Sequence, residues 1–210
     1  MNIYKRLYRF YGPQGWWPAR TRFEIMIGAI LTQNTAWANV EKAIVNLRRH
    51  GLISSPRAMK DVNERKLAGM IRPAGYYNVK ARRVKNFVNF LFSGYSGSLA
   101  GISRRETPRL REELLAVNGV GPETCDSILL YAFRRPIFVV DAYTKRIFSR
   151  HSFFAASATY EKVQKFFMAH LPKDERLFNE YHALIVRVGK DFCRTRPKCG
   201  PCPLRGIKIT

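Results

Sequence analysis

The chain has 210 residues, enough for one domain or two small lobes, and 46% of them are apolar, which excludes simple disorder. It carries 37 Lys and Arg against 15 Asp and Glu, a formal net charge of +22. This excess indicates a polyanionic partner, since clustered cations gain binding free energy by releasing counterions from phosphates. The alternative is a ribosomal-type or merely soluble basic protein.

Membrane and secreted classes are disfavoured. No segment approaches the roughly 20 apolar residues of a membrane span, and the start lacks the apolar run of a signal peptide. Three of the four cysteines fall within residues 193–202, which is unlike a disulfide framework. We therefore expect an intracellular, cytoplasmic protein that is associated with the nucleoid.

Helical spacing dominates the chain from residue 23 onward. Apolar residues recur at helical intervals over 23–47, and the polar run 32–35 predicts a break between two helices. Residues 79–92 form another such stretch, with basic residues expected opposite an apolar face, namely Lys80, Arg82, Arg83 and Lys85. Further along, Thr107 is expected to cap a helix in which Pro108 is the first residue.

The second half of the chain is also predicted to be helical. The only strand-like run, residues 137–140, is short and isolated, so a buried connector is expected there. Residues 160–188 again have a helical pattern. The fold class is therefore all-α.

A tight turn is predicted between two helices at residues 117–121. Gly119 and Gly121 permit a positive φ and a close approach of the backbone to a ligand. Pro122 is suited to the first position of the next helix, whose amides favour phosphate oxygens. The ordinary alternative is a turn between helices with a glycine C-cap.

Asp141 follows the apolar run and precedes another predicted helix. Its simplest role is to cap that helix. A carboxylate at the mouth of a pocket can also stabilise positive charge on a sugar and orient water while an N-glycosidic bond breaks. The two roles are compatible.

Together these motifs resemble the helix–hairpin–helix DNA glycosylase superfamily, which includes endonuclease III. Four motifs occur in the family order, at residues 31–35, 75–81, 119–124 and 139–141. The resemblance implies an all-α protein of two lobes with the DNA and the base bound in a cleft between them. It implies that Asp141 is the catalytic carboxylate. It also implies a DNA-binding hairpin made of Asn118, Gly119, Val120, Gly121 and Thr124.

The resemblance also divides the chain. A six-helix lobe is expected over residues 23–133, with the helix–hairpin–helix motif at about 108–133. Residues 1–22 and 134–210 are expected to form the second lobe, which ends in a basic, cysteine-containing tail over 187–210.

Glu123 departs from the pattern of the bifunctional members. These carry a lysine at the second position after the hairpin glycines, and that lysine attacks the sugar to form a Schiff base. A glutamate cannot form an imine, so the sequence predicts a monofunctional enzyme that uses water and leaves an abasic site. Glu123 can also lie at the edge of the base pocket, or simply act as a favourable acid in the first turn of a helix.

Within the superfamily, the chain most resembles the bacterial 3-methyladenine DNA glycosylase III branch, which implies alkylated purines as substrates. The base pocket implied is Trp16, Trp17, Trp37, Glu123 and Lys190, although tryptophans commonly pack in a core. Asn34 or Gln33, together with Tyr76, are implied to fill the gap in the duplex. Leu184 replaces a branch lysine, which leaves deaminated or mismatched pyrimidines as alternative substrates.

The basic tail contains Cys193, Cys199 and Cys202. Endonuclease III-type members bind a [4Fe–4S] cluster here through four cysteines. This chain has one residue fewer in the first gap, and Lys208 stands where the fourth cysteine belongs. The alternatives are a tail without metal, a cluster with an unusual fourth ligand, and zinc bound with the help of His182.

The predicted function is therefore that of a monomeric, monofunctional DNA glycosylase acting on damaged double-stranded DNA, with no required cofactor. The alternatives are a mismatch, uracil or thymine glycosylase, an abasic-site lyase, and a binder of damaged DNA without catalysis. Asp141 argues against the last of these, because a pure binder does not need a carboxylate at that position.

Overall fold

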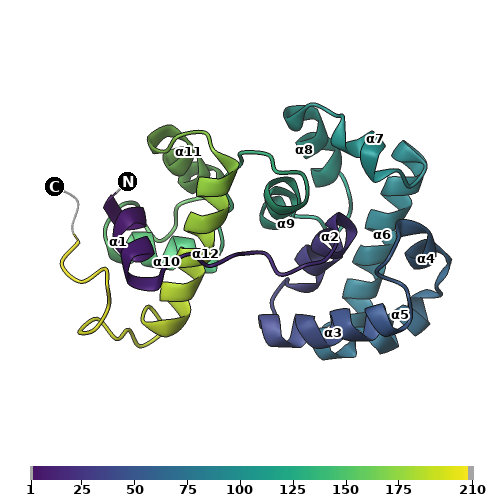
Figure 1. The fold of residues 1–210 in the computed structure, drawn as a ribbon, viewed down its shortest axis with the longest axis horizontal. Helices are drawn as coiled ribbons and strands as arrows, with labels where there is room; N and C mark the ends of the chain where they lie inside the picture. Colours follow the sequence, from purple (N-terminus) through teal and green to yellow (C-terminus); the bar gives the residue numbers. More distant parts are fainter. Residues whose placement is uncertain (1, 208–210) are drawn as a thin grey trace. The chain divides into compact units, whose positions relative to one another are not determined.

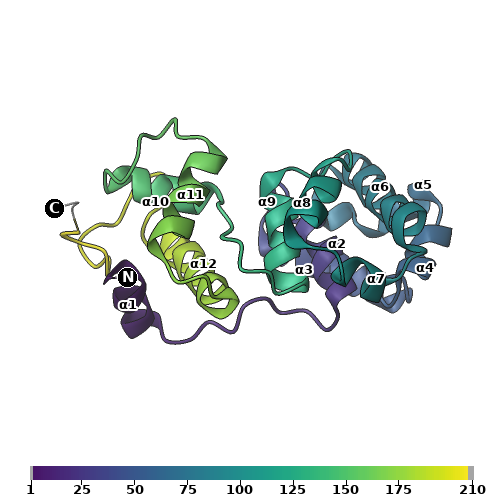
Figure 2. The same ribbon diagram turned by 90° about the horizontal axis from the view of Figure 1, so that it is seen from above.

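The computed structural model describes residues 2–207, which fold into helices and connecting turns without a strand (Figures 1 and 2). The predicted all-α class is thus confirmed. The chain forms two compact units, one internal, over residues 19–133, and one built from the two ends, up to Pro18 and from Arg134 onward. We call them the internal unit and the terminal unit. In the part of the chain that is described, no helix is long and apolar enough to cross a membrane.

The internal unit contains eight α-helices, one 3₁₀-helical turn and one π-helical turn. They are α2 (Arg22–Leu31), α3 (Trp37–Arg49), α4 (Pro56–Asp61), α5 (Glu64–Met70), the 3₁₀ turn η1 (Arg72–Ala74), α6 (Tyr77–Tyr95), α7 (Leu99–Ser103), α8 (Thr107–Leu115), α9 (Pro122–Ser127) and the π-helical turn η2 (Ile128–Ala132). The resemblance implies six helices here. Four of the eight observed helices are very short: α4, α5, α7 and α9 have only 6, 7, 5 and 6 residues, too few for a clear helical repeat.

Helix α2 is the buried centre of the internal unit. The Thr21 side chain accepts a hydrogen bond from the Glu24 amide at 3.1 Å, which fixes the start of the helix. Helix α2 packs against α3, α6, α9 and η2, so it is apolar nearly all round. The predicted break between two helices is confirmed, because α2 ends at Leu31 and α3 begins at Trp37.

The terminal unit consists of α1 (Asn2–Tyr11), α10 (Ala142–Arg150), α11 (Tyr160–His170) and α12 (Glu175–Asp191), with α12 packed against α1 and α10. Its core is aromatic: the Phe138 and Phe167 rings stack at 4.1 Å, and Phe148 meets Phe167 edge-on at 4.7 Å. The predicted buried connector is confirmed, since residues 138–140 are extended and at most 1% exposed. It leads directly into α10.

Candidate active site

The predicted hairpin lies between α8 and α9. The Val120 amide donates to the Val117 carbonyl at 3.0 Å and closes the turn. Gly121 is the N-cap of α9, and Pro122 is its first residue, as predicted. The predicted cap at the other end of the motif is wrong: Thr107 already lies within α8, and the N-cap is Glu106, whose side chain makes no capping bond.

The two glycines of the hairpin have different roles. Gly119 has a φ of +95°, and a Cβ there would collide with Cγ of Arg83. It therefore needs to be glycine for reasons of both backbone conformation and space. Gly121 has a φ of −87°, and a Cβ there would meet open space. Only the second glycine leaves room for a ligand to approach the backbone.

Gln33 joins the loop after α2 to this hairpin. Its Nε2 donates to the Gly119 carbonyl at 2.9 Å and to Oγ1 of Thr124 at 2.8 Å, and its Oε1 accepts from Arg83 at 2.5 Å. Thr124 is only 6% exposed. Gln33 and Thr124 thus hold the hairpin through hydrogen bonds within the protein. Gln33 and Asn34 are the two alternatives for filling the gap in the duplex, and of these Asn34 is the exposed one.

Other members of the predicted DNA-binding set lie on the surface of the internal unit. Tyr76 is 72% exposed, directly before α6. Asn118 accepts hydrogen bonds from Nδ2 of Asn86 on its carbonyl and its side-chain oxygen, at 3.2 and 3.4 Å. The Val120 side chain is buried, at 4% exposure, so only its backbone can face a ligand.

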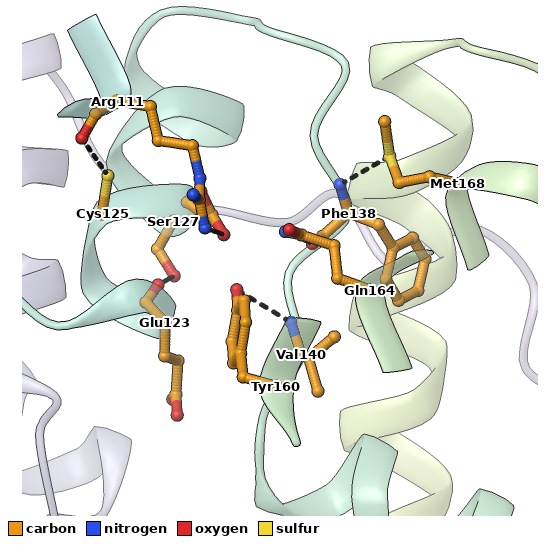
Figure 3. Close-up of polar contacts among 10 residues, drawn as sticks. Arg111, Glu123, Cys125, Ser127, Phe138, Val140, Tyr160, Gln164 and Met168 are labelled. Atoms are coloured by element: carbon orange, nitrogen blue, oxygen red, sulfur yellow. Dashed lines mark hydrogen bonds and ion pairs between the residues drawn. The ribbon is translucent and has the colours of Figure 1, made fainter. Parts of the chain in front are cut away.

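Two hydrogen bonds stabilise α9, the second helix of the helix–hairpin–helix motif (Figure 3). The Ser127 hydroxyl donates to the Glu123 carbonyl at 2.7 Å, and the Cys125 thiol donates to the Arg111 carbonyl. Arg111 also forms a two-point ion pair with Asp126, at 2.7 and 3.1 Å, and Asp126 is fully buried. This pair ties α8 to α9, and nothing in the local sequence indicates it.

Asp141 in the terminal unit is both a helix cap and a nearly buried carboxylate. It is 9% exposed, and its Oδ1 accepts from the amide of Thr144 at 2.7 Å and from the Thr144 hydroxyl at 2.8 Å. The predicted capping role is therefore confirmed. Its other oxygen, Oδ2, lies 3.7 Å from Nε2 of His182.

The chain before Asp141 is held from α11 (Figure 3). Nε2 of Gln164 donates to the Phe138 carbonyl at 2.7 Å, while the Phe138 amide donates to Met168 Sδ and the Val140 amide to the Tyr160 hydroxyl, both at 3.4 Å. These side chains satisfy backbone groups that no sheet partner provides. They fix the segment that positions Asp141.

His182 lies next to Asp141, a contact that the sequence pattern does not indicate. Burial lowers the pKa of its imidazole below the usual 6.5, while the charge of Asp141 acts in the opposite direction. His182 is therefore neutral at pH 7. A neutral imidazole does not form an ion pair with the adjacent Asp141 carboxylate.

The five predicted pocket residues are split between the units. Trp16, Trp17 and Lys190 lie together in the terminal unit: the two rings meet edge-on at 6.0 Å, and Nζ of Lys190 lies 5.8 Å from the centre of the Trp16 ring. Trp37 and Glu123 belong to the internal unit. Trp37 begins α3 and donates from Nε1 to Glu41 at 2.7 Å, and Glu123 lies in the first turn of α9.

The cysteine tail is tied to the terminal unit by guanidinium groups. Arg146 donates to the Cys193 carbonyl at 2.7 Å, and Arg150 donates to the carbonyls of Arg194 and Thr195 at 2.6 and 3.1 Å. Within residues 2–207, no three His, Cys, Asp or Glu side chains are placed to hold a metal ion. Lys208, at the position of the fourth cysteine, lies outside the described residues, and an ammonium group is not a metal ligand. The residues present do not fit a four-thiolate cluster.

Comparison with known proteins places these features in a family. Residues 27–173 match the HhH-GPD superfamily of base excision DNA repair proteins. A Methanocaldococcus jannaschii protein named as a DNA repair glycosylase is 50% identical over 97% of this chain and 93% of its own length. Endonuclease III of Sulfolobus acidocaldarius is 29% identical over 89% of this chain and 81% of its own.

Two solved structures are similar over nearly their whole length. The 3-methyladenine DNA glycosylase of H. pylori, bound to 1,N6-ethenoadenine, has a TM-score of 0.79 at 28% identity, over 90% of this chain and 96% of that one. An endonuclease III–DNA complex has a TM-score of 0.83 at 26% identity, over 99% and 92%. The hairpin, the capping aspartate and these likenesses agree, and the chain belongs to the HhH-GPD superfamily of base excision repair DNA glycosylases.

Proposed function

We propose that this glycosylase is monofunctional and removes an alkylated purine, such as 3-methyladenine, from double-stranded DNA. The observation that carries the proposal is Glu123 in the first turn of α9. By resemblance, bifunctional relatives have their attacking lysine at this position. A carboxylate there cannot form the covalent intermediate that leads to strand cleavage.

In this proposal Asp141 is the catalytic carboxylate. The bond between C1′ of the sugar and the base nitrogen breaks, and its electron pair leaves with the base. Positive charge develops on the sugar, where the Asp141 carboxylate stabilises it. Water supplies the oxygen that bonds to C1′ and loses a proton, so an abasic sugar remains. The bonds from Thr144 to Oδ1 support this role, because they fix the orientation of the carboxylate.

The hairpin is proposed to grip a phosphate, and the tryptophans to stack on the extruded base. The open space at Gly121 supports the first assignment, since a phosphate can approach the backbone there. The clustering of Trp16 and Trp17 supports the second. Flat aromatic faces suit electron-poor alkylated purines.

A panel of duplexes tests the reaction. Each duplex carries 3-methyladenine, 7-methylguanine, ethenoadenine, hypoxanthine, uracil, or thymine opposite guanine, and is incubated with the protein and analysed with and without alkali. We expect strand breaks that need alkali, greatest for the alkylated purines. Breaks without alkali, together with borohydride trapping of a protein–DNA adduct, would identify a lyase. Release of uracil or thymine alone would assign the pyrimidine substrates instead.

We also propose that the cysteine tail folds without a metal. The support is the set of bonds from Arg146 and Arg150 to tail carbonyls, which tie the segment to α10 through protein groups. Purified protein should be colourless, without the yellow-brown colour of a [4Fe–4S] cluster. Prolonged treatment with a chelator should leave the melting temperature unchanged. Bound iron at about four equivalents, or zinc at about one equivalent, with a loss of stability on chelation, would contradict the proposal.

A further inference from the structure

The internal unit contains a buried lysine that has no role in the proposed reaction. Lys80, in the first turns of α6, is 1% exposed. Its Nζ donates to the Leu31 carbonyl at 2.8 Å and to the Ala74 carbonyl at 2.7 Å. The prediction that Lys80 belongs to a basic face opposite the core is therefore wrong, because its long side chain turns inward to these two carbonyls.

The two carbonyls come from chain segments that are far apart in the sequence. Leu31 is the last residue of α2, and Ala74 is the last residue of η1. Carbonyls at a helix end have no partner within the helix, and a cation there also interacts favourably with the helix dipole. One ammonium group thus joins the ends of two elements.

Each of these elements leads directly into one of the proposed duplex-filling residues. Asn34 follows α2 in the loop that ends before α3, and Tyr76 follows η1 immediately before α6. Both residues are exposed. Both have a positive φ, 51° for Asn34 and 45° for Tyr76, a conformation that is unfavourable for residues other than glycine and persists only where the surroundings impose it.

The chemistry of Lys80 suits the role of a clamp. A buried amine costs free energy unless hydrogen bonds satisfy it, and burial, with the nearby charge of Arg83, lowers its pKa to about 8. It remains mainly protonated at pH 7, so its bonds to the two carbonyls are charge-assisted. A hydrocarbon side chain of the same length would fill the space but would leave both carbonyls unpaired.

We infer that Lys80 is a positioning residue that fixes the two loops bearing Asn34 and Tyr76 relative to one another, so that both can enter the duplex together when a base is extruded. This inference rests on the proposed function. Lys80 does not touch DNA in this role. It acts through the loops that its ammonium group holds.

Lys85 provides a matched control on the same helix. Its Nζ also donates to carbonyls, those of Lys60 at 2.5 Å and Val62 at 2.8 Å, at the end of α4. Lys85→Met therefore removes one positive charge and one lysine–carbonyl clamp, as Lys80→Met does. It leaves the loops of Asn34 and Tyr76 untouched.

The experiment measures base unstacking without catalysis. Both substitutions are made in the Asp141→Asn protein, and each variant is titrated into a duplex with 2-aminopurine opposite a tetrahydrofuran abasic-site analogue. We expect the reference protein to increase 2-aminopurine fluorescence at saturation, Lys85→Met to retain the increase, and Lys80→Met to lose most of it. In the active background, single-turnover base release by Lys80→Met should be slower by about 10-fold to 100-fold.

The outcomes separate the possible errors. If Lys80→Met and Lys85→Met reduce the fluorescence increase equally, Lys80 is only structural and the inference is overturned. It also fails if the reference protein gives no increase. If unstacking is normal but the active protein releases no base, the proposed function alone is wrong. Should Lys80→Met fail to fold, Lys80→Gln, whose amide keeps a donor, is used, and it should show a smaller loss in the same assay.

Discussion

At the scale of single residues, Asp141 combines a structural and a proposed chemical role that substitutions can separate. Oδ1 is used for the cap of α10, through the Thr144 amide and hydroxyl, while Oδ2 faces His182. Asparagine is as good an N-cap as aspartate but carries no charge. Alanine removes both properties.

Asp141→Asn should therefore fold normally and lose base release by at least about 100-fold, since a pre-positioned charge opposite the developing cation is lost. Its affinity for undamaged and abasic DNA should be equal or higher, because a negative charge near phosphate is removed. Asp141→Ala, as a control, should also lose about 0.5–2 kcal/mol of stability with the cap. Full activity in Asp141→Asn would exclude Asp141 as the catalytic carboxylate.

The neighbouring His182 predicts a pH dependence of stability. Burial lowers the pKa of the His182 imidazole in the folded state below its ordinary value of 6.5, which it keeps in the unfolded chain. At a pH between the folded-state and unfolded-state pKa, the unfolded chain therefore binds more protons than the folded one. Stability is then fully present above pH 6.5 and falls as the pH decreases below it. Urea unfolding midpoints measured between about pH 7.5 and about pH 5.5 should fall less for His182→Gln than for the parent protein. Parallel pH profiles would show that His182 does not contribute.

At the scale of elements, the helix–hairpin–helix motif depends on contacts made from outside it. Arg83 of α6 packs against Gly119, and Gln33 from the loop after α2 bonds to both sides of the turn. The α8–α9 pair is further joined by Arg111 and Asp126. The hairpin is thus held in the internal unit by side chains from other elements, and its two glycines can be distinguished by experiment.

Gly119→Ala should destabilise the protein by about 1–3 kcal/mol, because alanine must adopt a positive φ and its Cβ would collide with Arg83. Gly121→Ala should leave stability nearly unchanged, since its φ is ordinary and its surroundings are open. If a phosphate approaches Gly121, the second variant should nevertheless bind DNA more weakly. Thermal melts and fluorescence anisotropy measure the two effects. Equal stability losses would contradict the different roles of the two glycines.

At the scale of the whole molecule, the net charge of +22 is the dominant property. The 15 Asp and Glu residues are too few to pair with all 37 Lys and Arg residues. Much of the affinity for DNA should therefore be electrostatic and independent of sequence.

The apparent affinity for an undamaged duplex should fall steeply with salt. If about six phosphates are contacted, a decrease of about 1000-fold is expected between about 50 mM and about 200 mM salt. Titrations monitored by anisotropy give the slope of log K against log salt concentration. A slope near zero would mean that the charge serves another purpose than binding DNA.

Sequence patterns alone predict the all-α class, the break between α2 and α3, the turn before Pro122 and the cap at Asp141. Each of these depends on neighbours within a few residues, where periodicity and capping preferences act. The family also follows from short motifs in a fixed order. The short helices α4, α5 and α7 were not predicted separately, since so few residues do not establish a period.

Contacts between distant parts of the chain, by contrast, determine which polar side chains have a structural role. Gln33 turns to the hairpin, Lys80 is buried between two helix ends, and His182 lies beside Asp141. Gln33 and Gly119 are 86 positions apart in the chain, Lys80 and Leu31 are 49 apart, and His182 and Asp141 are 41 apart. A local pattern indicates whether a residue is polar, but packing between distant elements determines whether it meets solvent, a carbonyl or another charge.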